Sequence, residues 1–181
     1  MNFDIIIIGS GPGGYVAAIR ASQLGKKVAI VERESLGGIC LNWGCIPTKA
    51  LIKSAQVYNY INHASDYGIS VGSSKVEFKE VIGRSRNVAD GMSKGVTFLM
   101  KKNKITVIEG EGTLARGKKV VVKSADGKKA EYTADSIILA TGGRAKELPM
   151  LPIDGKNIIG YREAMTLSKQ PKFANANTVH Q

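Results

Sequence analysis

A glycine-rich turn between an apolar strand and an alanine-rich helix constrains this chain more than any other feature. Asp4–Gly9 is an isoleucine run typical of a buried parallel strand, and Tyr15–Leu24 has the composition of a helix. Between them lies the spacing Gly9-x-Gly11-x-x-Gly14, and Lys27–Glu32 predicts a second strand. The first 32 residues therefore predict a β-α-β unit of ordinary length and an α/β fold built on a parallel sheet.

Each glycine of this turn has a separate physical task. Gly9 makes the turn, Gly11 lets a ligand approach the backbone, and Gly14 lets the helix pack closely on the strand. Exposed N–H groups at the start of a helix favour an anion, so the turn is a candidate site for a pyrophosphate. Glu32, 18 residues after Gly14, is the expected acceptor for adenosine ribose hydroxyls. A tight helix turn that binds no nucleotide is the alternative.

The chain has two cysteines, Cys40 and Cys45, and their spacing indicates redox chemistry. Residues five apart do not share a helix face, so the turn between them must be distorted, and Gly44 supplies the conformational freedom. A strained disulfide that can close there is a reactive one. We expect Pro47 to lie early in a helix, whose N-terminal N–H groups would, together with Lys49, lower a thiol pKa.

Two other interpretations of the cysteines stay open. A zinc site needs two further ligands, and the histidines of the chain are His63 and His180. Two inert, buried thiols are the other alternative. We favour the redox pair, expect Cys40 to be the more exposed thiol, and assign no metal ligand.

The rest of the sequence predicts scaffold and a second glycine turn. Apolar spacing predicts one long helix over Phe78–Lys102. Ser136–Leu139 predicts a buried strand that ends in Thr141-Gly142-Gly143, and a short helix is expected near Arg162–Leu167. A small antiparallel meander is predicted from Ile105–Glu109, Lys119–Lys123 and Ala130–Thr133, with a hairpin turn at Asp126-Gly127.

Composition excludes several classes of protein. A chain of 181 residues fits one domain and the start of another, and its apolar runs are far too short to cross a bilayer. The net charge of +11 is spread along the chain without interleaved aromatic residues, which favours a solvated surface over binding to nucleic acid. Met1 is followed almost directly by a strand without a leader pattern, so we expect a cytoplasmic location.

Taken together, the two motifs resemble the pyridine nucleotide-disulfide oxidoreductases from residue 3 to about residue 172. Within that family the chain is most similar to the dihydrolipoamide dehydrogenases, since glutathione and mercuric reductases usually carry Val where Leu41 stands. The segment that carries this similarity is Gly38-Ile39-Cys40-Leu41-Asn42-Trp43-Gly44-Cys45-Ile46-Pro47-Thr48-Lys49-Ala50-Leu51. The resemblance implies a Rossmann-like FAD-binding fold with a parallel sheet, helices on both faces and a small antiparallel β-meander.

The resemblance also implies roles for individual residues. Cys40 would be the interchange thiol that meets the substrate sulfur, Cys45 the thiol that faces the flavin, and Lys49 a neighbour of the flavin N5 edge. Gly112 has an alternative interpretation as a simple turn glycine, and Trp43 and Tyr15 are expected to be packing residues. The residues implied to bind FAD are Gly9, Gly11, Gly14, Glu32, Arg33, Gly37, Gly38, Lys49, Gly112, Thr141, Gly142 and Gly143.

The activity implied by the resemblance is oxidation of protein-bound dihydrolipoamide to lipoamide. Electrons would pass through a Cys40–Cys45 disulfide and FAD to NAD+. The implied partners are a lipoyl-bearing protein and a second copy of the chain in a homodimer. A different flavoprotein disulfide reductase, of the glutathione or mercuric type, is one alternative, and a non-catalytic remnant that binds a nucleotide is another.

The resemblance divides the chain into two parts. Residues 1–148 are expected to form an incomplete FAD-binding domain, and residues 149–181 a linker and the start of an NAD-binding domain, frayed from Phe173 onward. Family members carry a second glycine fingerprint and a C-terminal His-Glu pair, but Gly142–Gly160 holds no such fingerprint and His180 lies in unmatched sequence. We therefore expect a truncated chain that is not competent alone.

Overall fold

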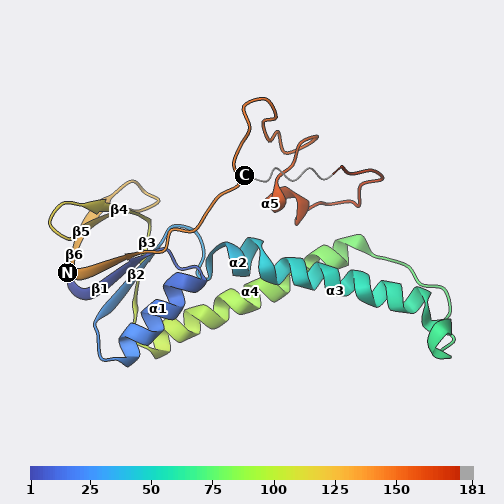
Figure 1. Cartoon of the computed structure of the whole chain (residues 1–181), viewed down its shortest axis with the longest axis horizontal. Coiled ribbons are helices and arrows are strands. Elements are labelled where there is room, and N and C mark those ends of the chain that lie inside the picture. The colour runs from blue at the N-terminus through green and yellow to red at the C-terminus, as the bar shows by residue number, and fades with distance from the viewer. Residues whose placement is uncertain (176–181) are drawn as a thin grey trace.

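A six-stranded sheet and the helices that connect its strands make up the fold, shown in Figure 1 as a computed structural model that describes residues 1–175. The strands are β1 (Asn2–Ile8), β2 (Val28–Glu32), β3 (Thr106–Glu109), β4 (Glu111–Ala115), β5 (Lys119–Lys123) and β6 (Lys129–Leu139). The helices are α1 (Pro12–Gln23), α2 (Gly38–Trp43), α3 (Cys45–Asn62), the 3-10 helix η1 (Ala64–Tyr67), α4 (Phe78–Lys102) and α5 (Tyr161–Ala164). The long helix predicted over Phe78–Lys102 is confirmed with the same bounds.

The strands lie in the order β3-β2-β1-β6-β5-β4. β1 pairs in parallel with β2 and β6, and β2 pairs in parallel with β3. β5 pairs antiparallel with both β4 and β6. The central strands are apolar because both of their faces are covered, and Ile6, Ile7 and Ile30 are fully buried. The expected α/β class, with a parallel sheet and a small antiparallel unit, is confirmed.

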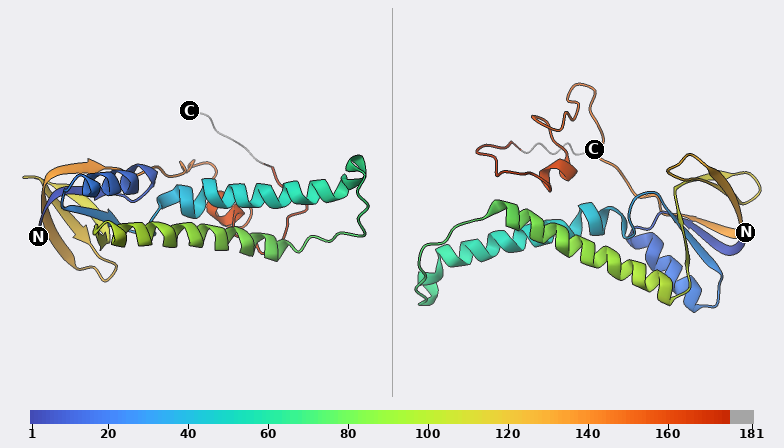
Figure 2. Two further views of the ribbon diagram at one scale, coloured as in Figure 1. Left: turned by 90° about the horizontal axis from the view of Figure 1, so that it is seen from below. Right: turned by 180° about the vertical axis from the view of Figure 1, so that it is seen from behind.

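The two faces of the sheet are covered by different kinds of element (Figure 2). Ile7 and Ile30 pack against α1, α2 and α4. Ile6 and Ile8 point to the other face, where they pack against Val120 of β5. Within residues 1–175 the helices therefore cover one face and antiparallel strands the other, in contrast to the expected helices on both faces. The crossovers from β1 to β2 and from β2 to β3 step in one direction, and right-handed crossovers then place their helices on one face.

The antiparallel unit also differs from the predicted meander. Thr106–Glu109 is a parallel edge strand beside β2, and the chain turns at Gly110 into β4, which the sequence analysis did not predict. β6 is one strand of 11 residues, where two separate strands were expected. Thr133 pairs with both β5 and β1, so the neighbours of β6 change there. This change interrupts the alternation of apolar side chains, and the sequence pattern therefore indicates two short strands.

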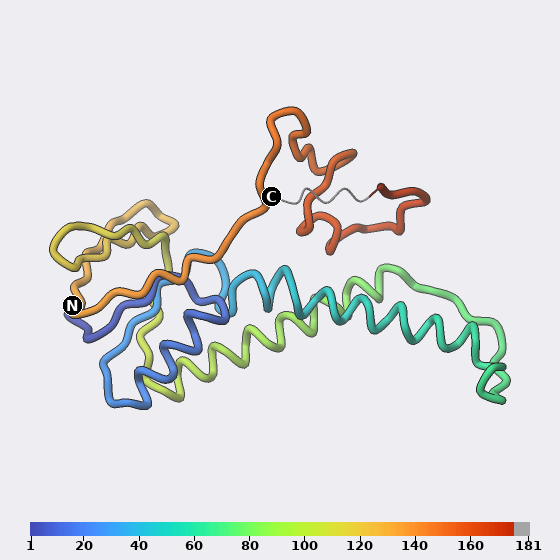
Figure 3. Tube along the Cα trace, in the orientation of Figure 1, coloured from blue at the N-terminus to red at the C-terminus, as the bar shows by residue number. Residues whose placement is uncertain are grey.

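Helices α3 and α4 pack side by side and extend beyond the sheet as an arm (Figures 1 and 3). Arg84 Nη1 on α4 donates a 2.9 Å hydrogen bond to the carbonyl of Ala50 on α3. α3 buries little else than Pro47 and Ala50, and Ile52 on the same helix is half exposed. No helix in the described part of the chain combines the length and the apolar character needed to cross a membrane.

Residues beyond β6 follow a mostly irregular path that returns to α2 (Figure 3). The short helix predicted near Arg162–Leu167 is present as α5, which begins one residue earlier and ends at Ala164. Residues 176–181, which include His180 and most of the tail that we expected to be frayed, lie outside the described residues.

Candidate functional site

The glycine-rich turn lies at the carboxyl end of β1, as predicted. Gly9 has a φ of +101°, in the left-handed region that favours glycine. A methyl group on Gly14 would collide with the carbonyl oxygen of Gly9, so α1 packs on the strand at this point. A methyl group on Gly11 would meet no atom within 4 Å, and no side chain caps α1. The start of α1 is therefore open to a ligand that accepts hydrogen bonds from the backbone.

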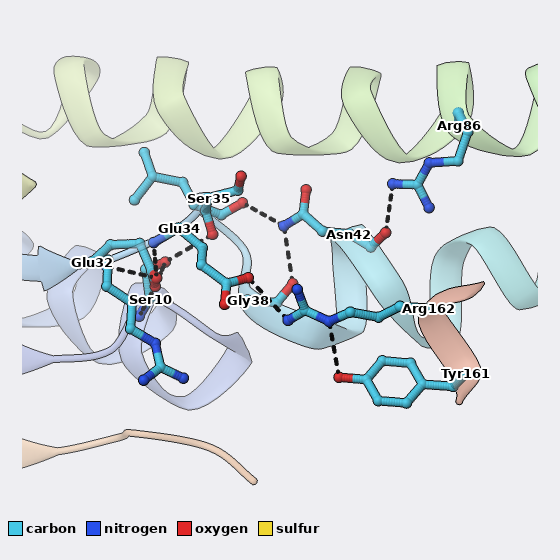
Figure 4. A network of polar contacts seen from close by, with 11 residues as sticks. Ser10, Glu32, Glu34, Ser35, Gly38, Asn42, Arg86, Tyr161 and Arg162 are labelled. Carbon is cyan, nitrogen blue, oxygen red and sulfur yellow. Dashed lines mark hydrogen bonds and ion pairs between the residues drawn. The ribbon is translucent and has the colours of Figure 1, made fainter. Parts of the chain in front are cut away.

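The carboxylate of Glu32 closes a polar network at the end of β2 (Figure 4). Its Oε2 accepts hydrogen bonds from the Ser10 N–H at 3.0 Å and from the Ser10 hydroxyl. Its Oε1 accepts from the N–H groups of Arg33 at 2.8 Å and Glu34 at 2.9 Å. Ser10 is fully buried, so Glu32 satisfies donors that water does not reach. Glu32 thus joins the glycine turn to β2, a role that the sequence analysis did not assign.

A break at Gly44 separates the two cysteines, as their spacing predicted. Cys40 lies in α2 and Cys45 begins α3, with Gly44 at φ −134° and ψ −113° between them. At the start of α2, Gly38 has a φ of +60°, and a methyl group there would lie 2.7 Å from Cα of Gly11. A residue without a side chain is therefore needed where α2 touches the glycine turn. This close approach brings the two sequence motifs into one site.

The two thiols are in contact, but their surroundings differ from the expectation. A side-chain hydrogen bond with Cys45, followed by burial, raises the pKa of the Cys40 thiol. Lys49 acts to lower this pKa, as expected, but its effect is smaller than the effects that raise it. Cys40 is half-buried and Cys45 is exposed. The expected low pKa is therefore wrong for Cys40, and so is the expectation that Cys40 is the more exposed thiol.

A cavity of about 310 Å³ collects residues from both motifs. This volume is at the lower end of the range for small-molecule sites. Gly14, Gly37, Cys45 and Lys49 are not part of the lining, so the expected role of Cys45 as the thiol that faces a flavin remains a prediction. The predicted residues that line the cavity are Gly9, Gly11, Glu32, Arg33, Gly38, Cys40, Gly112, Thr141, Gly142 and Gly143.

The sequence analysis missed Arg162, which lines the same cavity from α5. Its Nη2 donates a 2.9 Å hydrogen bond to Glu34 Oε2 (Figure 4). Its Cζ lies 5.1 Å from the centre of the Trp43 ring, and Cζ of Arg86 on α4 lies 4.4 Å from the same centre. Trp43 is thus a packing residue, as expected, but it packs against two cations. No local pattern marks Arg162, because Glu34 is 128 residues away in the sequence.

The donors of the site suit a dinucleotide better than a metal ion. Among residues 1–175, no group of three or more His, Cys, Asp and Glu side chains could hold a metal ion. The cavity has an open helix start at Gly11 and is lined by three arginines, Arg33, Arg144 and Arg162, which complement the charge of phosphate groups. A side chain at Gly11 would occupy the space that a pyrophosphate needs. The residues present therefore fit the phosphate groups of a dinucleotide.

Known proteins resemble the chain over nearly its whole length. The sequence is 52% identical to the dihydrolipoyl dehydrogenase of Rhizobium etli and 48% identical to that of Zymomonas mobilis. Each alignment covers 94% of this chain, but 39% and 37% of those proteins, respectively. The crystal structure of LpdA from Mycobacterium tuberculosis is similar with a TM-score of 0.82 and 25% identity, over 91% of this chain and 37% of that one.

The chain thus spans less than two fifths of the length of these relatives. The family Pyridine nucleotide-disulphide oxidoreductase matches residues 3–178. The match includes the glycine turn, the redox segment and the return of the chain through α5. The chain belongs to the pyridine nucleotide-disulphide oxidoreductase family.

Proposed function

We propose that this chain is the FAD-binding, redox-disulfide part of a dihydrolipoyl dehydrogenase. The observation that carries the proposal is the close approach of Gly38 to Gly11, which puts Cys40 in the lining of the cavity at the start of α1. A redox thiol can exchange electrons with a flavin only when it lies beside the dinucleotide site, and Cys40 lies there. The names of the relatives from Rhizobium etli and Zymomonas mobilis support the choice of substrate.

In the proposed reaction, the residues of this chain carry out thiol–disulfide exchange. The dithiol of dihydrolipoamide transfers two electrons and two protons to the Cys40–Cys45 disulfide, which yields lipoamide and two cysteine thiols. Gly44 gives the turn the freedom to close and reopen the disulfide. Gly11 and Glu32 hold the pyrophosphate and the ribose of FAD in place. FAD, when bound, supplies the two-electron chemistry that links the thiols to NAD+.

The same proposal covers the partners and the domains. The substrate is dihydrolipoamide on a lipoyl-bearing protein, the protein acts as a homodimer in the cytoplasm, and NAD+ is the final acceptor. Residues 1–148 belong to the FAD-binding domain and residues 149–181 to the segment that leads into an NAD-binding domain. The residues assigned to FAD are those of the glycine turn, Glu32–Cys40, Lys49, Gly112 and Thr141–Gly143.

Two measurements on the purified chain test the proposal. First, FAD titrated into the chain should be bound, with quenching of flavin fluorescence, and ADP should compete for the site. Second, one equivalent of dihydrolipoamide should reduce the Cys40–Cys45 disulfide faster than two equivalents of glutathione at the same pH. Absence of FAD binding would contradict the cofactor assignment. Equal rates with both dithiol and monothiol, after correction for thiol concentration, would contradict the choice of lipoamide.

A further inference from the structure

Trp43 stands between the two cysteines in the sequence and is the only tryptophan of the chain. It is the last residue of α2, directly before the break at Gly44. The guanidinium groups of Arg86 and Arg162 both lie within cation–π distance of its ring, with Cζ at 4.4 Å and 5.1 Å from the centre. We call these three residues the Trp43 clamp. The clamp contacts the redox segment at Trp43, directly beside Gly44, where the backbone must change its angle.

Each arginine of the clamp is fixed by its own hydrogen bonds. Arg86 Nη2 donates a 2.6 Å hydrogen bond to the carbonyl of Asn42, while its buried Nη1 has no hydrogen-bond partner within residues 1–175. Arg162 donates to Glu34 Oε2 at 2.9 Å and to the Tyr161 hydroxyl at 3.3 Å. Figure 4 shows the two arginines reaching α2 from different helices, Arg86 from α4 and Arg162 from α5. The two guanidinium groups that contact the Trp43 ring are therefore themselves restrained by hydrogen bonds.

Fixing Trp43 restricts the motion that separates the two thiols. Cys40 is part of α2 and Cys45 begins α3, so the distance between their sulfur atoms depends on the angle at Gly44. Trp43 is the residue next to this hinge. Arg162 contacts the Trp43 ring and also binds Glu34, another residue of the cavity lining. A thiol pair that is held in place forms a disulfide more readily, because less conformational freedom is lost when the bond closes.

We propose that Arg162 is a positioning residue for the redox pair, acting through Trp43. The proposal rests on the proposed function in one respect, namely that Cys40 and Cys45 form a disulfide. The contacts of Arg162 are with Tyr161, Glu34 and the ring of Trp43, and through this ring Arg162 limits the hinge at Gly44. Loss of Arg162 loosens the turn and makes the disulfide less favourable relative to the two thiols.

The equilibrium with glutathione measures this effect. In that reaction the two cysteine thiols lose two protons and two electrons and form one S–S bond, while oxidised glutathione gains them and becomes two glutathione thiols. The full chain is equilibrated with glutathione mixtures at pH 7, quenched with acid and analysed by mass spectrometry. For Arg162→Gln we expect the equilibrium constant for disulfide formation to fall about two- to fivefold, the range for a cation–π contact at a partly exposed site.

A control variant separates positioning from loss of charge. Lys53→Gln removes one positive charge and one cation–π contact, since Lys53 Nζ lies 5.9 Å from the centre of the Tyr60 ring, on the same helix as Cys45. This control should leave the equilibrium constant unchanged. The emission of Trp43 gives a second readout, because it should move to longer wavelength and be quenched more by acrylamide in Arg162→Gln, but not in Lys53→Gln.

The outcomes distinguish the proposal from the function on which it rests. If the wild-type chain forms no Cys40–Cys45 disulfide, the proposed function is wrong, and the positioning role of Arg162 is wrong with it. If the disulfide forms but Arg162→Gln has the wild-type equilibrium constant, the positioning role is wrong. A lower melting temperature of Arg162→Gln with an unchanged equilibrium constant shows a merely structural contact and overturns the proposal as well.

Discussion

The carboxylate of Glu32 connects the glycine turn to β2, so its removal should affect stability as well as binding. We expect Glu32→Ala to lower the free energy of unfolding by about 1–3 kcal/mol, because the buried N–H and hydroxyl of Ser10 lose their acceptor. FAD binding should weaken about tenfold or more, since a charged acceptor contributes roughly 1.5–3 kcal/mol. Urea denaturation and calorimetric titration measure the two effects.

Glu109→Ala is the matched control for this substitution. Glu109 pairs with Glu32 across the β2–β3 ladder, is exposed and does not line the cavity. It should keep both the stability and the affinity of the wild-type chain. If Glu32→Ala and Glu109→Ala behave alike in both measurements, Glu32 has neither the structural nor the binding role.

The environments of the two cysteines predict the order in which they react. In the reduced chain, Cys45 should be alkylated before Cys40, because Cys45 is exposed and the pKa of Cys40 is raised. A raised pKa means that less Cys40 thiolate is present at any pH below it. Cys45→Ala removes the largest cause of the rise and should shift the pH midpoint of Cys40 alkylation downward. Peptide mass spectrometry after partial alkylation gives the order, and faster labelling of Cys40 in the wild-type chain contradicts the prediction.

Local spacing was sufficient to find the residues whose partners lie nearby in the sequence. Gly9, Gly14 and Gly44 were assigned correctly, because a turn, a close helix contact and a helix break each depend on a few adjacent residues. The pKa of Cys40 was misjudged although its main partner, Cys45, is close in the sequence, because the side-chain contact across the break at Gly44 and the burial of Cys40 do not follow from spacing. Arg162 was missed because its position depends on how the chain returns after β6.

The packing of helix α1 depends on Gly14, whereas the adjacent Gly13 has room for a side chain. We expect Gly14→Ala to lower the free energy of unfolding by at least about 1–3 kcal/mol, because the added methyl group collides with the backbone carbonyl of Gly9. Gly13→Ala is the control: its methyl group would meet no atom within 4 Å, and alanine favours the helix by about 0.5–1 kcal/mol. Thermal unfolding of both variants tests this, and equal melting temperatures would rule out the close contact.

The same contrast between local and distant information explains which elements were predicted. α4 and the strands β1 and β2 have patterns that repeat over their whole length, so α4 was predicted with its observed bounds, and β2 and β1 to within one and two residues at each end. β3 was assigned to the wrong partner, because a four-residue strand carries no information on whether it joins a parallel or an antiparallel neighbour. The division of the two faces between helices and antiparallel strands follows from the direction of the crossovers, which a sequence pattern does not contain.

The chain as folded exposes more surface than its mass requires. Its accessible surface is 12,689 Å² for 19.3 kDa, whereas a compact monomer of this mass exposes about 8,500 Å². The α3–α4 arm extends away from the sheet (Figure 3). The arm and the segment 63–77 that joins its two helices expose large apolar side chains, namely Ile52, Val57, Tyr58, Tyr60, Tyr67, Ile69, Val71, Val76, Val88 and Met92.

We expect the chain to self-associate through this arm. Stable homodimers bury about 2,000–5,000 Å² in total, or roughly 1,000–2,500 Å² on each chain, so a dimer interface would cover about a quarter to three fifths of the excess. The net charge of +11 opposes association, so added salt should strengthen it by screening the repulsion between copies. Sedimentation velocity over a range of protein and salt concentrations should show species larger than 19.3 kDa.

Substitutions on the arm decide whether it is the surface that associates. Replacing Ile52 and Met92 by Gln removes two exposed apolar side chains without changing the net charge, and the dissociation constant should rise about tenfold or more, since each buried apolar side chain contributes roughly 1.5–3 kcal/mol. Leu24→Gln, at the end of α1, removes an equally exposed apolar side chain outside the arm and should leave association unchanged. A chain that sediments as a 19.3 kDa monomer at every concentration contradicts the prediction, and equal effects of the arm and control substitutions show that association does not depend on the arm.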